Sequence, residues 1–245
     1  MKSVRITGGK SLKGEVIPQG AKNEALQVLS AVLLTDDKVT INNIPDIIDV
    51  NKLIEILKNL GVTCSNLKNG SYEFSAKTVN LDYLKSDEFT TYAKSLRGSI
   101  MLVGPLLARY KNASIPRPGG DKIGRRRLDT HFVNLEKLGA KLDYDSKNRI
   151  YNVKTNGLIG VDLLLDEASV TGTANLIMAS VLAKGDTRIY NAACEPYIQQ
   201  LCSMLIKMGA NIQGIGSNLL TISGVEKLNG ATHTILPDMI EIGSW

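Results

Sequence analysis

The 245-residue chain repeats one pattern three times, with a period of 74 residues. In each copy an apolar helical run leads through a charged turn into a short strand, and these strands end at Ile41, Ile115 and Ile189. Repetition at a fixed period indicates one supersecondary unit that buries its apolar face only against its neighbours. The chain is therefore predicted to form one domain of three packed copies of the same unit.

Two types of segment alternate within each copy. The first is apolar on nearly all sides, with glycine and alanine interspersed, so its helix should be buried. This core segment occupies residues 23–41, 96–115 and 172–189. The second predicts an amphipathic helix that ends in Leu-Gly or Met-Gly, followed by a strand–turn–strand hairpin, and it should lie outside the first. This outer segment occupies residues 49–64, 129–142 and 195–212.

The outer segments carry local start, stop and turn signals. In the first copy, Asp49 is a plausible N-cap and Gly61 a C′ residue in the left-handed region. Asn69-Gly70 is a hairpin turn signal. The apolar stripe of this helix, at helical spacing, is Val50, Leu53, Leu57 and Leu60. The stripe of the third copy is Ile198, Leu201, Leu205 and Met208.

Each unit thus reads helix, strand, helix, hairpin, and three units span residues 21–236. This order predicts an α/β domain with helices inside, sheets around them and approximate threefold symmetry. Residues 1–20 form a leading strand or hairpin that belongs to no unit. Residues 237–245 begin a further element, and the stop in mid-pattern leads us to expect an incomplete second domain.

Scarce residue types exclude several classes of function. Cys64, Cys194 and Cys202 lack any CxxC spacing, so we expect reduced, buried thiols and neither a disulfide framework nor a zinc site. Neither His131 nor His233 lies in a nucleophile motif. Aromatic residues make up 5% of the chain, which disfavours a base-stacking platform for nucleic acid. No apolar run approaches the roughly 20 residues of a membrane span, and the N-terminus lacks a signal-peptide core, so we expect a cytoplasmic protein.

The predicted N-termini of the three core helices are polar. The first carries Lys22 and Asn23, the second Arg97, and the third the Ser169-Val170-Thr171 run. Helix N-termini present unpaired N–H groups and partial positive charge, which suits anions, although ordinary helix caps would look similar. A cation at a helix N-terminus opposes the dipole, and such local costs tend to mark ligand sites.

Residues 117–127 are the densest charge cluster, with five cations, one carboxylate and three glycines. The composition predicts a loop. Backbone N–H groups and guanidinium forks in such a loop can wrap a phosphate, but a solvated surface loop or a nucleic-acid patch fits equally well. The carboxylate, Asp121, should be strongly paired with the cations, or poised as a proton donor if a bound anion offsets them.

Together these residues carry a family resemblance. The chain resembles the bacterial UDP-N-acetylglucosamine 1-carboxyvinyltransferases, which are enolpyruvyl transferases, along its whole length. The residues that carry it are GxxxxxGAKNxAL (14–26), LRxSxxxxGPLLAR (96–109), PGGxxIGxRxxDxH (118–131), EPxI (195–198) and LPDxIExG (236–243). Members are longer than this chain, which looks like the N-terminal half and a little more.

The resemblance implies a fold of two similar domains, each an inside-out α/β barrel of three repeated units. It implies that enolpyruvyl passes from phosphoenolpyruvate to the 3′-hydroxyl of UDP-N-acetylglucosamine, with release of phosphate, in peptidoglycan precursor synthesis. No metal or other cofactor, nucleic acid or membrane is implied. The shikimate enolpyruvyl transferases share the fold, but the GAKN and PGGxxIGxR motifs disfavour that reading.

Residue roles follow from the resemblance alone. Lys22 and Arg97 would bind phosphoenolpyruvate, Asn23 would contact the sugar nucleotide, and Arg126 would grip the phosphate. The uracil and ribose would lie against Arg127, Leu128 and Asp129. The diphosphate would meet Ser169, Val170 and Thr171, although many members carry glycine in place of this threonine. His131 matches a histidine near the nucleotide, and core packing is an equal alternative for it.

Asp121 departs from the usual pattern, because most members carry a cysteine there that donates a proton and is alkylated by fosfomycin. An aspartate donates a proton only if its pKa rises well above about 3.9. We therefore expect a fosfomycin-insensitive enzyme that uses Asp121. The resemblance places the base and a further arginine in a second domain, so this chain alone is expected to be inactive. A non-catalytic nucleotide-sugar-binding fragment is the alternative.

Overall fold

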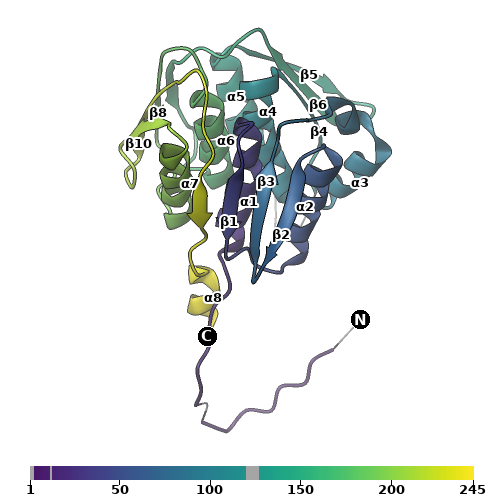
Figure 1. Ribbon diagram of the computed structural model, residues 1–245, viewed down its shortest axis with the longest axis vertical. Coiled ribbons are helices and arrows are strands. Elements are labelled where there is room, and N and C mark those ends of the chain that lie inside the picture. The colour runs from purple at the N-terminus through teal and green to yellow at the C-terminus, as the bar shows by residue number, and fades with distance from the viewer. Residues whose placement is uncertain (1–2, 12, 120–126) are drawn as a thin grey trace.

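The computed structural model describes residues 3–11, 13–119 and 127–245 (Figure 1). The three strands that the repeat predicts are present as β1 (Val39–Asn42), β4 (Asn112–Pro116) and β8 (Asp186–Tyr190). Each contains the isoleucine that the 74-residue period singles out, and all three isoleucines are buried. The repeat in the sequence is therefore a repeat in the structure.

Each unit runs helix, strand, helix, hairpin, as the sequence predicts. The first unit consists of α1 (Lys22–Ala31), the 3₁₀ helix η1 (Val32–Leu34), β1, α2 (Ile48–Asn59), β2 (Thr63–Lys68) and β3 (Ser71–Ser75). The second consists of the 3₁₀ helix η3 (Arg97–Leu102), α4 (Val103–Tyr110), β4, α5 (Asp129–Lys137), β5 (Ala140–Asp145) and β6 (Ile150–Thr155). The third consists of α6 (Val170–Ser180), β8, α7 (Pro196–Lys207), β9 (Asn211–Gln213) and β10 (Leu219–Ser223).

Every unit contributes an antiparallel three-stranded sheet in which the last strand lies in the middle. The orders are β1-β3-β2, β4-β6-β5 and β8-β10-β9. Two sheets gain a parallel strand from outside their own unit, because β7 (Asp162–Leu164) joins β8 and β11 (Thr232–Thr234) joins β1. Since β11 follows the third unit and pairs with the first, it ties the two ends of the repeat together.

The core helices lie among the sheets and are buried nearly all round (Figure 1). Every residue of α1 from Glu24 to Ala31 and of α6 from Gly172 to Ser180 is buried. The outer helices α2, α5 and α7 each bury one face only, because their apolar residues recur at helical spacing. The apolar stripes that the sequence predicts for α2 and α7 are all buried.

Two local signals are confirmed and one is wrong. Gly61 has φ = 96° directly after the last residues of α2, and Asn69 and Gly70 both have positive φ in the β2–β3 turn. Asp49 is not the N-cap of α2, because the helix begins one residue earlier and its N-cap is Ile47, which has no side-chain cap. The carboxylate of Asp49 pairs with Lys22 instead.

The structure adds elements that no repeat signal predicts. Between the first two units lie the 3₁₀ helix η2 (Leu81–Lys85) and α3 (Asp87–Lys94). The serine before α3 caps it, since Ser86 Oγ accepts from Phe89 N at 3.0 Å. This insertion packs against β4 and η3 of the second unit, whose sheet has three strands among the described residues where the other two sheets have four.

The two ends of the domain cross beside the start of α1. Ala21 N donates to Leu236 O at 2.8 Å, and Asp238 N donates to Gln19 O at 2.8 Å. Gly20 is required at this crossing, because a Cβ there would meet the Asn43 carbonyl oxygen at 2.0 Å. Beyond it, the N-terminal segment and α8 (Met239–Ser244) extend from the body of the domain (Figure 1), and no residue of α8 is buried.

Candidate active site

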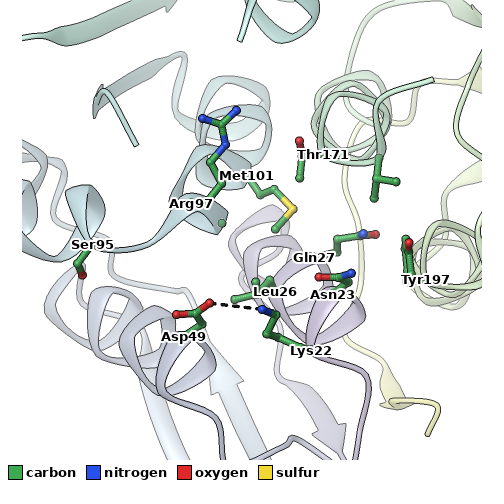
Figure 2. A pocket seen from close by; sticks show the side chains of 12 residues that line it. Lys22, Asn23, Leu26, Gln27, Asp49, Ser95, Arg97, Met101, Thr171 and Tyr197 are labelled. Carbon is green, nitrogen blue, oxygen red and sulfur yellow. Dashed lines mark ion pairs between the residues drawn. The ribbon is translucent and has the colours of Figure 1, made fainter. Parts of the chain in front are cut away.

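The N-terminal ends of all three core helices open on one cavity of about 250 Å³ (Figure 2). Lys22 and Asn23 reach it from α1, Arg97 from η3, and Val170 and Thr171 from α6. The sequence singles out these N-termini as polar and suited to anions, and the structure brings five of the predicted site residues together there. The convergence follows from the repeat, because equivalent helices of three packed units point the same way.

The helix ends at the cavity suit an anion. Neither Ala21 before α1 nor Leu96 before η3 provides a side-chain cap, whereas Ser169 caps α6 by accepting from Gly172 N at 3.2 Å. Backbone N–H groups at such ends carry partial positive charge. With Lys22 and Arg97 at the same cavity, the positive potential exceeds what three helix ends alone would create.

Lys22 makes a long ion pair at the cavity, whereas Arg97 is hydrogen-bonded to the rim of the cavity, which residues 127–129 form. Lys22 Nζ lies 3.7 Å from Asp49 Oδ2, and both side chains are more than one-third exposed, so a bound anion could compete for this ammonium. Arg97 Nη2 donates to the Arg127 carbonyl oxygen at 3.2 Å. That contact joins the cavity to residues 127–129, where the family resemblance implies nucleotide contacts.

Asn23, Tyr197 and Gln27 form one wall of the cavity. Burial raises the pKa of Tyr197, and a hydrogen bond with Asn23 opposes that rise, so the phenol stays protonated at neutral pH. Gln27 is 1% exposed, and its Oε1 has no hydrogen-bond partner among the described residues. An unpaired buried acceptor is costly unless a bound molecule satisfies it.

The predicted nucleotide residues lie beside the cavity and not in its lining. Arg127 Nε pairs with Asp129 Oδ2 at 2.7 Å, and its Nη1 lies 3.6 Å from Asp166 Oδ2. The pKa of Arg127 is raised, chiefly by the hydrogen bond to Asp129. Leu128 is buried and immediately precedes α5, while Asp129 is the first residue of that helix.

Asp166 adds an acidic group at this rim that the sequence does not single out. Thr130 Oγ1 donates to Asp166 Oδ1 at 2.6 Å, and this hydrogen bond is the main reason that the pKa of Asp166 is lowered. Asp166 belongs to the connection between β7 and α6. It therefore links the start of α5 to the start of α6, where Ser169 stands.

Two predicted catalytic residues, Asp121 and Arg126, lie outside the described residues. His131 is 1% exposed and belongs to the interior, where its ring contacts Thr171 and Asn175. Cys202 is buried as expected and Cys64 is partly buried, but the expectation of buried thiols is wrong for Cys194, which is exposed. Its place just before α7 leaves the side chain at the surface.

Sequence reasoning missed several lining residues, among them Gln27, Asp49 and Tyr197. A signal existed for Gln27, because it stands four residues after Asn23 and so shares its helix face. Tyr197 is the variable position of the EPxI motif (195–198), for which the sequence predicted no substrate contact. Asp49 gave no usable signal, since helix-capping was the simpler interpretation of an aspartate before an apolar stripe.

Among residues 3–11, 13–119 and 127–245, no group of three or more histidine, cysteine, aspartate or glutamate side chains could hold a metal ion. None of the helices in the same ranges has the length and apolar character that crossing a membrane requires.

Comparisons with known proteins place the chain among related sequences. The profile of the EPSP synthase (3-phosphoshikimate 1-carboxyvinyltransferase) family matches residues 6–245. The UDP-N-acetylglucosamine 1-carboxyvinyltransferase of Bacteroides fragilis is 60% identical over all 245 residues, and that of Borreliella burgdorferi is 46% identical over 244 residues. The chain covers 56% of each of these two relatives, so it spans about half of their length.

Solved structures agree on the fold. The enolpyruvyl transferase NikO from Streptomyces tendae superposes with a TM-score of 0.78 at 19% identity, covering 97% of this chain and 55% of that one. An EPSP synthase from Acinetobacter baumannii gives a TM-score of 0.73 at 17% identity, covering 95% of this chain and 52% of that one. At these identities the likeness concerns the fold alone.

Proposed function

This chain belongs to the EPSP synthase family of enolpyruvyl transferases, and on that basis we propose that it carries part of a site that transfers enolpyruvyl from phosphoenolpyruvate to UDP-N-acetylglucosamine. One observation carries the proposal, namely the cavity where three helix N-termini meet Lys22, Asn23 and Arg97. Both substrates are polyanions, and this cavity has the charge and the N–H donors to hold them. The 46–60% identities favour the nucleotide-sugar acceptor over the shikimate acceptor.

The acceptor and donor would occupy different parts of this region. Lys22 and Arg97 hold phosphoenolpyruvate, and Asn23 orients the sugar hydroxyl. The start of α6, Ser169 to Thr171, receives the diphosphate. The uracil and ribose lie beyond it, against the rim of Arg127, Leu128 and Asp129, which Arg97 contacts through the Arg127 carbonyl oxygen.

The reaction would run by addition and elimination. The sugar 3′-hydroxyl oxygen attacks C2 of phosphoenolpyruvate as its proton passes to the base that the resemblance places in a second domain, while C3 takes a proton from Asp121, which gives a tetrahedral ketal. C3 then loses a proton as the C2–O bond to phosphate breaks, which restores the double bond and releases inorganic phosphate. Lys22, Arg97 and Arg126 stabilise the developing negative charge, and proximity supplies much of the acceleration.

An aspartate at position 121 carries a consequence for inhibition. A carboxylate is a poorer nucleophile than a thiolate towards an epoxide, so we propose that fosfomycin does not label this protein. Mass spectrometry after incubation with the drug tests this. A stoichiometric adduct on Asp121 would contradict the proposal.

We also propose that residues 21–236 form an inside-out barrel of three units about an approximate threefold axis. Residues 1–20 and 237–245 would then belong to a second domain. Apolar side chains in these two segments are exposed, as expected of surfaces that pack elsewhere: they are Val4, Ile6, Val16, Ile17, Met239, Ile240, Ile242 and Trp245. Because the chain spans about half the length of its relatives, we expect it to bind the nucleotide sugar but to release little phosphate by itself.

Calorimetry on the 245-residue chain tests the proposed function. We expect saturable binding of UDP-N-acetylglucosamine, but none of shikimate 3-phosphate or of an oligonucleotide. Lys22→Ala should weaken phosphoenolpyruvate binding, whereas Lys38→Ala should not, because Lys38 pairs with Glu73 on the surface away from the cavity. Binding of the oligonucleotide with no binding of the nucleotide sugar would overturn the proposal.

A further inference from the structure

A line of hydrogen bonds between polar groups runs from the contact between α4 and α6 to the candidate site. Gly104 N donates to Asn175 Oδ1 at 2.7 Å, and Asn175 Nδ2 donates to the Ile100 carbonyl oxygen at 2.9 Å. The same Nδ2 lies 2.9 Å from His131 Nδ1, and His131 Nε2 lies 3.2 Å from Thr171 Oγ1. Asn175 and His131 are buried, whereas Thr171 lines the cavity.

The two outer contacts of Asn175 determine which way its amide points. A backbone N–H only donates and a carbonyl oxygen only accepts, so Gly104 requires Oδ1 on its side and Ile100 requires Nδ2 on the other. Both contacts agree on one orientation. The close approach depends on glycine, because a Cβ at position 104 would meet Asn175 Oδ1 at 2.8 Å and its backbone oxygen at 2.4 Å.

The amide orientation in turn determines the tautomer of His131. Nδ1 of the ring faces an amide nitrogen that can only donate, so Nδ1 must accept and carries no proton. A neutral imidazole then has its proton on Nε2, which faces Thr171 Oγ1. Burial in the interior, and next the positive charge of Arg97, lower the pKa of His131 to about 3, so the ring is neutral at physiological pH.

The tautomer leaves the hydroxyl of Thr171 one role. Its oxygen accepts from His131 Nε2, so its own proton cannot point back to the ring. Among the described residues no other acceptor is in hydrogen-bond contact with this hydroxyl, and the side chain lines the cavity. The O–H therefore points to whatever oxygen occupies the cavity.

We propose that Asn175 and His131 are positioning residues that hold the Thr171 hydroxyl as a hydrogen-bond donor to an anionic oxygen of the bound substrate. The inference rests on the proposed function for the identity of that oxygen, which belongs to a phosphoryl group of the nucleotide sugar. A donor that is oriented before binding needs no reorganisation when the anion arrives. The neutral histidine matters because it transmits the direction of the amide without bringing a charge of its own.

The tautomer can be measured without any ligand. The chain contains two histidines, so nitrogen-15 NMR of the imidazoles identifies the signals of His131 as those lost in His131→Gln. We expect the proton on Nε2 and none on Nδ1 at pH 7. A proton on Nδ1, or on both nitrogens, overturns the inference.

Asn175→Asp should reverse the donor and acceptor roles along this line of hydrogen bonds. The carboxylate has no N–H, so the oxygen facing the ring would accept, the proton would move to Nδ1, and the Thr171 hydroxyl would turn its proton towards Nε2. A neutral histidine whose single proton stays on Nε2 in this variant contradicts the inference. If the variant does not fold by circular dichroism, the wild-type tautomer and the Thr171 variants decide.

Binding of UDP-N-acetylglucosamine tests the second half. Thr171→Val removes the donor and should weaken binding about tenfold to a hundredfold, as for a hydrogen bond to a charged group. Thr171→Ser keeps the hydroxyl and should bind within about threefold of wild type. Asn175→Asp should weaken binding by a similar factor to Thr171→Val, and the double variant should lose little more than either, because both changes remove one donor.

The outcomes separate the two proposals. Equal binding by wild type and Thr171→Val, or fully additive losses in the double variant, overturns the positioning role. No binding of the nucleotide sugar by the wild-type chain overturns the proposed function. In that case the tautomer measurement still decides the direction of the hydrogen bonds from Asn175 through His131 to Thr171.

Discussion

Arg109 makes the contacts whose loss should destabilise this domain most clearly. Its Nη1 donates to the carbonyl oxygens of Leu33, Thr35 and Ala76 at 2.9–3.0 Å, and its guanidinium pairs with Asp36. The Leu33 and Thr35 carbonyls lie at the end of the buried helix of the first unit, where the helix dipole favours a cation. Arg109 stands at the end of α4, so it joins the first two units.

The magnitude follows from these partners. Arg109→Ala leaves three carbonyl oxygens without this donor, and each lost hydrogen bond should cost about 1 kcal/mol or more of stability. The substitution also removes a positive charge that solvent screens only weakly, because the Arg109 side chain is 17% exposed. We expect the free energy of unfolding to fall by about 3–5 kcal/mol, the range for removing one partner from a buried charged network. Arg109→Lys keeps the charge but not the geometry of the guanidinium, so it should lose about half as much.

Urea unfolding followed by far-UV circular dichroism measures this change, with equal m-values as the check that the variants unfold between the same states. Arg188→Ala is the matched control, because Arg188 is 53% exposed and lies 3.6 Å from an exposed Asp162 carboxylate. Such a surface pair is worth less than about 1 kcal/mol. Equal losses in the two alanine variants would refute the reasoning.

Three further predictions concern titration and reactivity. Because the pKa of His131 is about 3 in the folded chain against an ordinary 6.5, the unfolded state alone binds a proton between these values. Stability should therefore fall as the pH drops below about 6.5, by up to about 1.4 kcal/mol per unit, and His131→Gln should lose that part of the slope in urea titrations from pH 7 to 5. Iodoacetamide at pH 8 should modify the exposed Cys194 first, because burial raises the pKa of Cys64 to about 11 and of Cys202 to about 12; equally fast labelling of Cys202 in the folded chain would contradict this. Asp121→Cys should make the protein open to fosfomycin labelling, detected as a mass increase that the wild type does not show.

Much of the fold could be predicted from local pattern. The 74-residue period, the buried strands at Ile41, Ile115 and Ile189 and the hairpin turn at Asn69-Gly70 all follow from side chains that are near in sequence. The starts of α1 at Lys22 and of η3 at Arg97 could also be predicted, because polar residues there precede apolar runs. Such signals are local, so no tertiary contact is needed to read them.

The exceptions depend on contacts between distant residues. The parallel pairing of β11 with β1 joins residues about 190 positions apart, and nothing in the short Thr232–Thr234 segment specifies that partner. Asp49 looked like a helix cap because capping is a local rule, yet its carboxylate pairs with Lys22, and both side chains line the cavity. Arg109 likewise gave no local sign of the three carbonyl groups that it satisfies.

The sequence by itself determined the repeated unit, the family resemblance and which side chains gather at the helix ends. Only the tertiary structure decided how those side chains are directed: that Gln27 and Tyr197 share the cavity with Asn23, and that His131 is a neutral link to Thr171. The physical reason is that periodicity records which face of an element is buried. The direction of a hydrogen bond depends on donors and acceptors that meet only after α4, α5 and α6 have packed together.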